Sequence, residues 1–219
     1  GGRRSLVLNR ETMAVEPVSW ELLEGGVRYV RLENFYDHSA DKLNAAVDDL
    51  AARGATALLF DVRNNGGGYV TELPAMLDHL LPEGPVFRLE YKDGGEQVSQ
   101  SDAACVDLPM AVLVNRDTYS AAELFAAQLK ETAGAVVVGE TTSGKGHSQQ
   151  TFTLPNGGGL NISTARYTTG GGVSLIGTGV ALDAEIEMEE AQRTALAAGD
   201  LSQEEDLHLQ KALALLAER

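Results

Sequence analysis

The sequence predicts an α/β fold in which a central mixed β-sheet is flanked by helices, with an additional β-hairpin region and a C-terminal helix. Short apolar runs typical of buried strands alternate with segments rich in helix formers, which is the pattern of α/β proteins. The segment 151–169 then changes to two strand-like runs separated by Pro155-Asn156-Gly157, as in a β-hairpin. Near the end, Leu209, Leu213 and Leu216 form one apolar stripe of a helix.

The elements follow in order along the chain. Residues 26–33 are strand-like, and Ser39 can cap a helix through Leu50 that places Leu43, Val47 and Leu50 on one face. The remaining predicted elements are strands at 57–62, near 86–91 and 110–114, and at 135–138, and helices around 71–81 and over 121–130.

The C-terminal part has a different composition. Residues 183–201 are acidic and rich in alanine, which we interpret as a linker. Ser202 and Glu205 have the spacing of a capping box, so the last helix is expected to begin there. We expect its leucine stripe to pack on its own domain, and docking to another subunit, giving a homo-oligomer, is the alternative.

Composition excludes several classes of function. The 219 residues are 43% hydrophobic, enough for a full core, and the single cysteine, Cys105, excludes an internal disulfide. A formal net charge of −15 argues against nucleic acid and anionic membrane surfaces as partners, because both require a basic face. No stretch reaches the roughly 18 apolar residues of a membrane span, and no signal peptide is recognisable. His38, His79 and His208 lack ligand-like spacing, so we expect no metal and no cofactor.

Ser120 is the candidate nucleophile. It follows the apolar run 110–114 and a polar connection, and it precedes the helix-forming segment 121–130. A serine at a helix N-terminus faces free backbone N–H groups and the positive end of the helix dipole, which stabilise a developing oxyanion. The amide of Ala121 is the natural first donor. The plainer interpretation of an isolated serine here is a helix cap.

Lys145 is the candidate general base, because a serine needs a neighbour that takes its proton and lysine is one known solution. The pKa of a lysine must fall from about 10.4 to roughly 7 to 8 for this role, and burial among apolar groups lowers it. An apolar strand, 135–138, precedes the turn that carries Lys145. His147, with Asp61 or Glu140 behind it, is the alternative base, and a solvated surface lysine is the plain interpretation.

A glycine-rich loop is the candidate source of a second oxyanion donor. It runs from Asp61 through Gly66, Gly67 and Gly68, directly after the apolar run 57–60. Glycines allow close approach of the backbone to a ligand and positive φ angles. An ordinary turn is the alternative interpretation of such a cluster. We expect Asp61 and Arg63 to brace the loop rather than to act on substrate.

Three segments, 60–68, 112–123 and 137–150, resemble in this order the core motifs of the carboxyl-terminal processing (tail-specific) protease family. The likeness extends through most of residues 10–186. It implies a ClpP/crotonase-like core that cleaves peptide bonds with a Ser/Lys dyad. It also implies the roles of individual positions: Ser120, three residues before Glu123, as nucleophile, Lys145 in Gly-Lys-Gly as base, Gln149 as the residue that orients the dyad, and Gly67 with Ala121 as the oxyanion hole.

Two positions depart from the family pattern. Tyr119 stands before the nucleophile, where a small residue is frequent, and Ser143 replaces an aromatic residue before Gly144. Neither change removes a catalytic atom, so the resemblance implies retained activity with a different side-chain preference. Glu131 matches an acidic position near the end of the helix after the serine and is expected to be structural.

The resemblance also suggests a division of the chain. Residues 1–12 resemble the last strand of the PDZ domain that family members carry, which suggests a trimmed chain or a fragment. Residues 13–186 would form the peptidase core, and residues 187–219 an acidic linker and the C-terminal helix. The family usually acts outside the cytoplasm, so a periplasmic or membrane-associated extracytoplasmic location is implied.

Two functions of different classes follow from these observations. The first is a serine endopeptidase that cleaves unstructured proteins near apolar C-terminal tails through an acyl-enzyme on Ser120. The second is a catalytically silent module on the same fold that binds peptides or apolar ligands. The combination of serine, lysine, glutamine and glycine loop favours the first.

Overall fold

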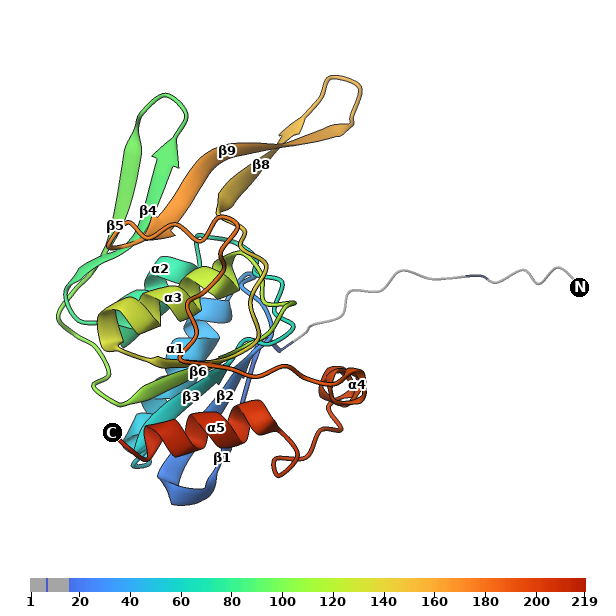
Figure 1. The fold of residues 1–219 in the computed structure, drawn as a ribbon. Coiled ribbons are helices and arrows are strands. Elements are labelled where there is room, and N and C mark those ends of the chain that lie inside the picture. The colour runs from blue at the N-terminus through green and yellow to red at the C-terminus, as the bar shows by residue number, and fades with distance from the viewer. Residues whose placement is uncertain (1–6, 8–15) are drawn as a thin grey trace, which may run out of the picture.

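The computed structural model describes residue 7 and residues 16–219, so the expected PDZ strand within 1–12 lies outside the described residues apart from residue 7. A six-stranded sheet forms the centre of the fold (Figure 1). Its first two strands pair antiparallel and all other neighbours pair parallel, which confirms the predicted central mixed sheet. In spatial order the strands are β1 (Val18–Leu22), β2 (Val27–Leu32), β3 (Ala57–Asp61), β6 (Met110–Val114), β7 (Val136–Gly139) and β10 (Ala184–Glu185).

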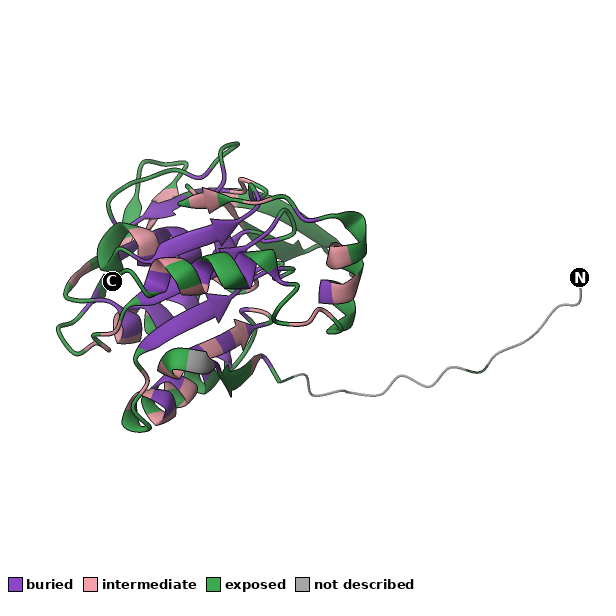
Figure 2. Cartoon of the chain, turned by 60° about the horizontal axis from the view of Figure 1, so that its bottom comes forward, coloured by how far each residue is buried: buried purple, intermediate pink, exposed green. Residues whose placement is uncertain are grey.

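Both faces of this sheet are covered by helices, as expected for parallel strands made of continuous apolar runs. Strands β3, β6 and β7 are buried along their whole length, and Figure 2 shows them in the interior. The helices α1 (Ser39–Ala52), α2 (Leu73–Leu80) and α3 (Ala121–Ala133) share the larger core with one face of the sheet. The opposite face is covered by α5 (Leu207–Leu216) (Figure 1).

Helix α5 packs on its own domain, in agreement with the first of the two sequence interpretations. Leu209, Ala212 and Leu216 are buried against Leu113 and Val138 of the central sheet. The leucines that suggested oligomerisation pack in the core between this helix and the sheet. Oligomerisation through this helix stays a prediction.

A second sheet carries the predicted hairpin. It consists of four antiparallel strands in the order β5 (Glu96–Ser101), β4 (Gly84–Tyr91), β9 (Gly159–Thr169) and β8 (His147–Thr153). The β8–β9 hairpin has its turn at the predicted Pro155-Asn156-Gly157 but is longer than predicted, and it projects from the body together with the β4–β5 hairpin (Figure 1). The additional β-hairpin region is therefore confirmed.

Several local expectations were wrong. Strands β1 and β5 were not predicted. Both are short edge strands, and none of their apolar residues is fully buried. The acidic segment interpreted as a linker contains helix α4 (Glu190–Ala198). A 3₁₀ turn, η1 (Glu24–Gly26), also precedes β2.

The two predicted helix caps were also misplaced. Ser39 is the first residue of α1, after His38 at a φ of 70°, and its hydroxyl is 3.2 Å from Asn34 Oδ1. Ser202 and Glu205 do bond to each other, but they close a turn before α5. The N-cap of α5 is Asp206, whose carboxylate accepts the Leu209 N–H at 3.1 Å.

No helix within the described ranges has both the length and the apolarity needed to cross a bilayer. Over the same residues, no three His, Cys, Asp or Glu side chains gather as a metal site would require.

Candidate active site

Ser120 occupies a strained backbone position at the start of α3. Its φ and ψ are 59° and −118°, and its side chain is almost completely buried. A positive φ at a residue other than glycine costs about 1–3 kcal/mol and persists only where neighbouring contacts hold it. The Ser120 N–H donates to Glu123 Oε2 at 2.9 Å, and the Tyr119 N–H donates to the Asn65 carbonyl at 3.0 Å. The backbone is thus fixed on both sides of the hydroxyl.

Glu123 connects the segment of the serine to the segment of the lysine. Its carboxylate is fully buried and accepts the Ser120 N–H, the Gly144 N–H at 2.6 Å and the Lys145 N–H at 3.1 Å. The hydroxyls of Thr142 and Ser143 add bonds of 2.7 and 2.9 Å. One carboxylate therefore sets the distance between two loops that meet only in the folded chain.

Lys145 precedes strand β8 and is half-buried. Its Nζ donates to Gln149 Oε1 at 3.2 Å and lies 4.8 Å from the centre of the Tyr119 ring. The ring that departs from the family pattern therefore contacts the candidate base directly. Within residues 16–219 no hydrogen bond joins Lys145 Nζ to Ser120 Oγ, and apo active sites often tighten such contacts only when substrate binds.

Tyr167, on β9, contacts both segments. Its ring is buried, and its hydroxyl donates to the Lys145 carbonyl at 2.6 Å and lies 3.3 Å from Ser120 Oγ. Burial raises the pKa of the Tyr167 hydroxyl above its usual value, so the phenol stays neutral. The sequence analysis assigned no role to this side chain.

A pocket of about 310 Å³ brings together three of the predicted site residues, Ser120, Lys145 and Gln149. His147, the alternative base, lines the same pocket, as does Gly68. A scissile carbonyl placed in this pocket would lie beside residues of the candidate dyad, because Ser120 and Lys145 both line it.

The candidate oxyanion donors lie beside Ser120. Ala121 is the first residue of α3, and no acceptor within the described part of the chain takes its N–H. Gly67 packs so closely that an added Cβ would be 2.9 Å from Ala121 N, but its N–H already donates to Asn65 Oδ1 at 2.8 Å. The role of Gly67 as a donor stays a prediction, and it requires that bond to be shared or broken.

Gly68 is a second glycine whose N–H could act as an oxyanion donor. Phe35 bonds to Gly67 O and Tyr69 N in a parallel bridge, so the N–H of Gly68 itself points away from Phe35. Gly68 also lines the pocket of Ser120, and an added Cβ would meet the Phe35 carbonyl at 2.4 Å.

Asp61 and Arg63 anchor the start of the glycine loop through buried ion pairs, as expected. Both are buried, and Arg63 is held between Asp61 and Asp206, with bonds of 2.8 and 2.7 Å to the two oxygens of Asp206. Burial alone would raise the pKa of the Asp61 carboxyl, but the Arg63 guanidinium outweighs it and holds that pKa below its usual value. The loop is thereby tied to the N-terminus of α5.

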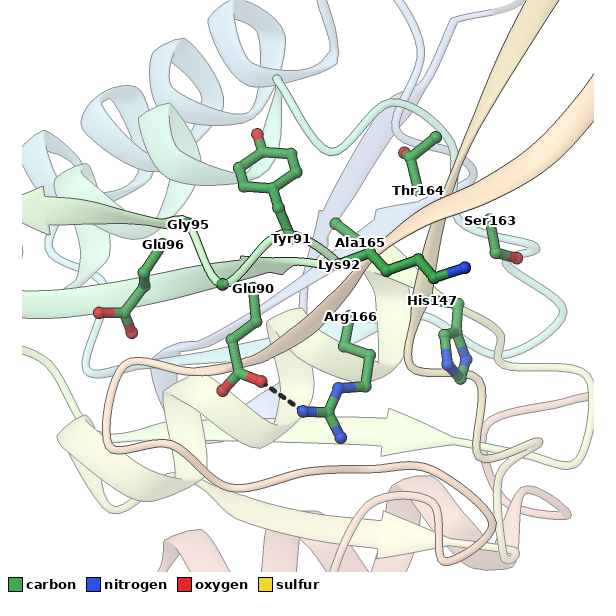
Figure 3. A pocket seen from close by; sticks show the side chains of 11 residues that line it. Glu90, Tyr91, Lys92, Gly95, Glu96, His147, Ser163, Thr164, Ala165 and Arg166 are labelled. Carbon is green, nitrogen blue, oxygen red and sulfur yellow. Dashed lines mark hydrogen bonds and ion pairs between the residues drawn. The ribbon is translucent and has the colours of Figure 1, made fainter.

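A larger pocket, about 720 Å³, lies between the two hairpins (Figure 3). Lys92 and His147 extend into it, and Arg166 is paired with Glu90 at 2.9 Å. Its serine, Ser163, lies within strand β9 and not at a helix N-terminus, and among the lining residues only His147 also lines the pocket of Ser120. We therefore place the candidate active site in the smaller pocket.

Comparison with known proteins identifies the family. Residues 26–186 match the family model described as peptidase family S41. The chain is 32% identical over 173 residues to the carboxy-terminal processing protease CtpA of Bacillus subtilis (strain 168), which covers 78% of this chain and 37% of that protein. It is also 32% identical over 221 residues to the carboxyl-terminal-processing protease of Picosynechococcus sp., covering 98% and 52%.

The fold agrees with a solved relative. The chain superimposes on the photosystem II D1 C-terminal processing protease with a TM-score of 0.74 and 28% identity, over 91% of this chain and 55% of that chain. It spans between 37% and 52% of the length of the two curated relatives named above. Because the family model matches well over half of its residues, the chain belongs to peptidase family S41, as its three sequence motifs predicted.

Proposed function

We propose that this chain is a serine endopeptidase that cleaves unstructured proteins near apolar C-terminal tails, with Ser120 as nucleophile and Lys145 as general base. The observation that carries the proposal is the shared pocket of Ser120, Lys145 and Gln149, held together by the five hydrogen bonds to Glu123. A structural serine cap would not need a lysine and its acceptor at the same cavity. Family membership and the names of the relatives support the same class of reaction.

The proposed reaction has two steps. Ser120 Oγ attacks the scissile carbonyl carbon and its proton passes to Lys145 Nζ, giving a tetrahedral oxyanion near the N–H of Ala121. The C–N bond then breaks, and Lys145 returns the proton to the leaving amine. Water next attacks the ester and gives a proton to Lys145, which restores the Ser120 hydroxyl as the acid product leaves. Gln149 keeps the lysine amine at the pocket through its 3.2 Å hydrogen bond.

Cleavage of an unfolded protein with an apolar C-terminus, analysed by mass spectrometry, tests this function. We expect Ser120→Ala and Lys145→Met to abolish cleavage, because each removes one partner of the proton transfer. Lys211→Met, which removes an exposed lysine of α5, is the matched control and should cleave like the parent. A Lys145→Met variant that cleaves normally would refute the lysine as base.

A second arm separates the protease from the silent binding module. The same substrate with a polar C-terminus should be cleaved more slowly if apolar tails are recognised. A parent chain that binds the apolar substrate with no cleavage product would support the binding module instead. We further propose, from the bacterial and chloroplastic relatives, that the protein acts outside the cytoplasm. Fractionation of the source cells tests this location.

A further inference from the structure

We propose that Tyr167 is a further catalytic residue, whose hydroxyl holds Ser120 Oγ in its attacking position and keeps the Lys145 segment in register with it. The inference rests on the proposed peptidase function. Tyr167 is the residue whose side chain touches the nucleophilic oxygen and the backbone of the candidate base at once, with distances of 3.3 Å to Ser120 Oγ and 2.6 Å to Lys145 O.

The protons in this arrangement can be assigned. A phenol has one proton to donate. The short contact shows that the Tyr167 hydroxyl donates it to the Lys145 carbonyl, which can only accept. The Tyr167 oxygen then has a lone pair for the Ser120 hydroxyl, which donates to it in the resting state and turns toward Lys145 Nζ before proton transfer. When Lys145 Nζ takes the Ser120 proton, the Tyr167 hydroxyl keeps its own proton in the hydrogen bond to the Lys145 carbonyl. Tyr167 therefore neither gains nor loses a proton. Its burial, which keeps the phenol neutral, supports this role and argues against a role as base.

The tyrosine is rigid enough to position the serine. Its ring is 1% exposed and lies 6.4 Å from the centre of the Phe87 ring, and its own N–H donates to the Gly146 carbonyl at 3.0 Å. Backbone and side chain of one residue therefore bind the consecutive carbonyls of Lys145 and Gly146. A nucleophile held near its attacking position reacts faster, because less freedom is lost on reaching the transition state.

Tyr167→Phe removes only the hydroxyl and keeps the ring in its packing site. We expect kcat for a peptide substrate to fall about 10-fold or more, with KM within about twofold, because the loss lies in the chemical step rather than in binding. Covalent modification of Ser120 by a small fluorophosphonate should slow by a similar factor. This readout needs no peptide binding. A purely structural role would lower the thermal midpoint and leave the labelling rate below that temperature unchanged.

Tyr91→Phe is the matched control, since it removes a hydroxyl on the same sheet that bonds Gln97 at 3.2 Å, and it should react like the parent. Tyr167→Met, which deletes the hydroxyl with a flexible apolar side chain, replaces the phenylalanine variant if that one does not fold. Labelling of a folded hydroxyl-free variant at the parental rate would overturn the role of Tyr167 alone. A parent chain that is not labelled at Ser120 would overturn the proposed peptidase and this inference together.

Discussion

Glu123 accepts five hydrogen bonds, and its conversion to glutamine should disable the site without unfolding the protein. Glutamine has the same shape, but one carboxylate oxygen becomes an NH₂ group that faces at least one backbone N–H, that of Gly144 or those of Ser120 and Lys145. A buried donor left without an acceptor costs about 1–3 kcal/mol. We expect Glu123→Gln to slow fluorophosphonate labelling of Ser120 by about 10-fold or more, a change of about 1.4 kcal/mol in the barrier.

Glu131→Gln supplies the comparison for this prediction. Glu131 belongs to the same helix but is exposed, so the same chemical change there should leave the labelling rate at the parental value. If Glu123→Gln labelled as fast as the parent, the carboxylate would be a structural group of α3 and would not set the relation between Ser120 and Lys145.

The residue scale also shows where sequence reasoning ends. Ser120, Lys145 and Gln149 could be proposed from local motifs, because a helix start and a glycine-flanked turn are visible in the sequence. The contact of Tyr167 with Ser120 could not, since 47 positions separate them and their meeting depends on how the second sheet lies on α3. Glu123 was seen only as a motif position, because its other partners come from a distant loop.

At the scale of elements, Asp206 links the last helix to the glycine loop and should matter for stability. It caps α5 and binds the buried Arg63 through both oxygens. Removing one partner of a buried ion pair costs about 3–5 kcal/mol, because the other charge stays buried. Arg63 keeps Asp61, so we expect Asp206→Ala to cost about 3 kcal/mol in the free energy of unfolding, measured by urea titration.

Asp200→Ala is the control for this measurement. Asp200 is exposed in the connection between α4 and α5, so its loss should change the free energy of unfolding by less than about 0.5 kcal/mol. Equal unfolding midpoints for the two variants would contradict a stabilising link through Arg63. The misplaced cap at Ser202 has a related cause, because the residue that caps α5 is the one that Arg63 holds across 143 positions, which no local pattern reveals.

At the scale of the whole molecule, the apolar runs predicted the central sheet because parallel strands buried on both faces need continuous apolar sequence. The runs around Leu59, Leu113 and Val137 are continuously apolar, and all three residues are buried in the core. Edge strands such as β1 and β5 are not buried on both faces, so no continuous apolar run marks them in the sequence. The order of the strands was not predicted, since every buried run is compatible with several neighbours.

The acid sensitivity of the whole fold should depend on His208, a buried residue in the first turn of α5 that bonds the Ile186 carbonyl through Nε2 at 2.7 Å. Burial lowers the pKa of His208 and Arg63 adds to this shift, while the hydrogen bond to the Ile186 carbonyl and the charges of Asp206 and Glu140 oppose it. The unfolded chain, with a histidine pKa of about 6.5, therefore binds a proton before the folded chain does. The free energy of unfolding then falls as the pH drops below that value, by at most about 1.4 kcal/mol per pH unit.

His208→Gln can still donate to Ile186 and should flatten the decline of the urea midpoint between about pH 7.5 and 5.5. The control is His38→Asn, at an exposed position whose positive φ asparagine tolerates, and it should leave the decline unchanged. The pKa of Asp61 is depressed in the folded chain, so Asp61 lowers the stability only when the pH falls below the carboxyl pKa of the unfolded chain, about 4. An unaltered slope in His208→Gln above pH 5.5 would therefore assign the acid sensitivity to groups other than this histidine.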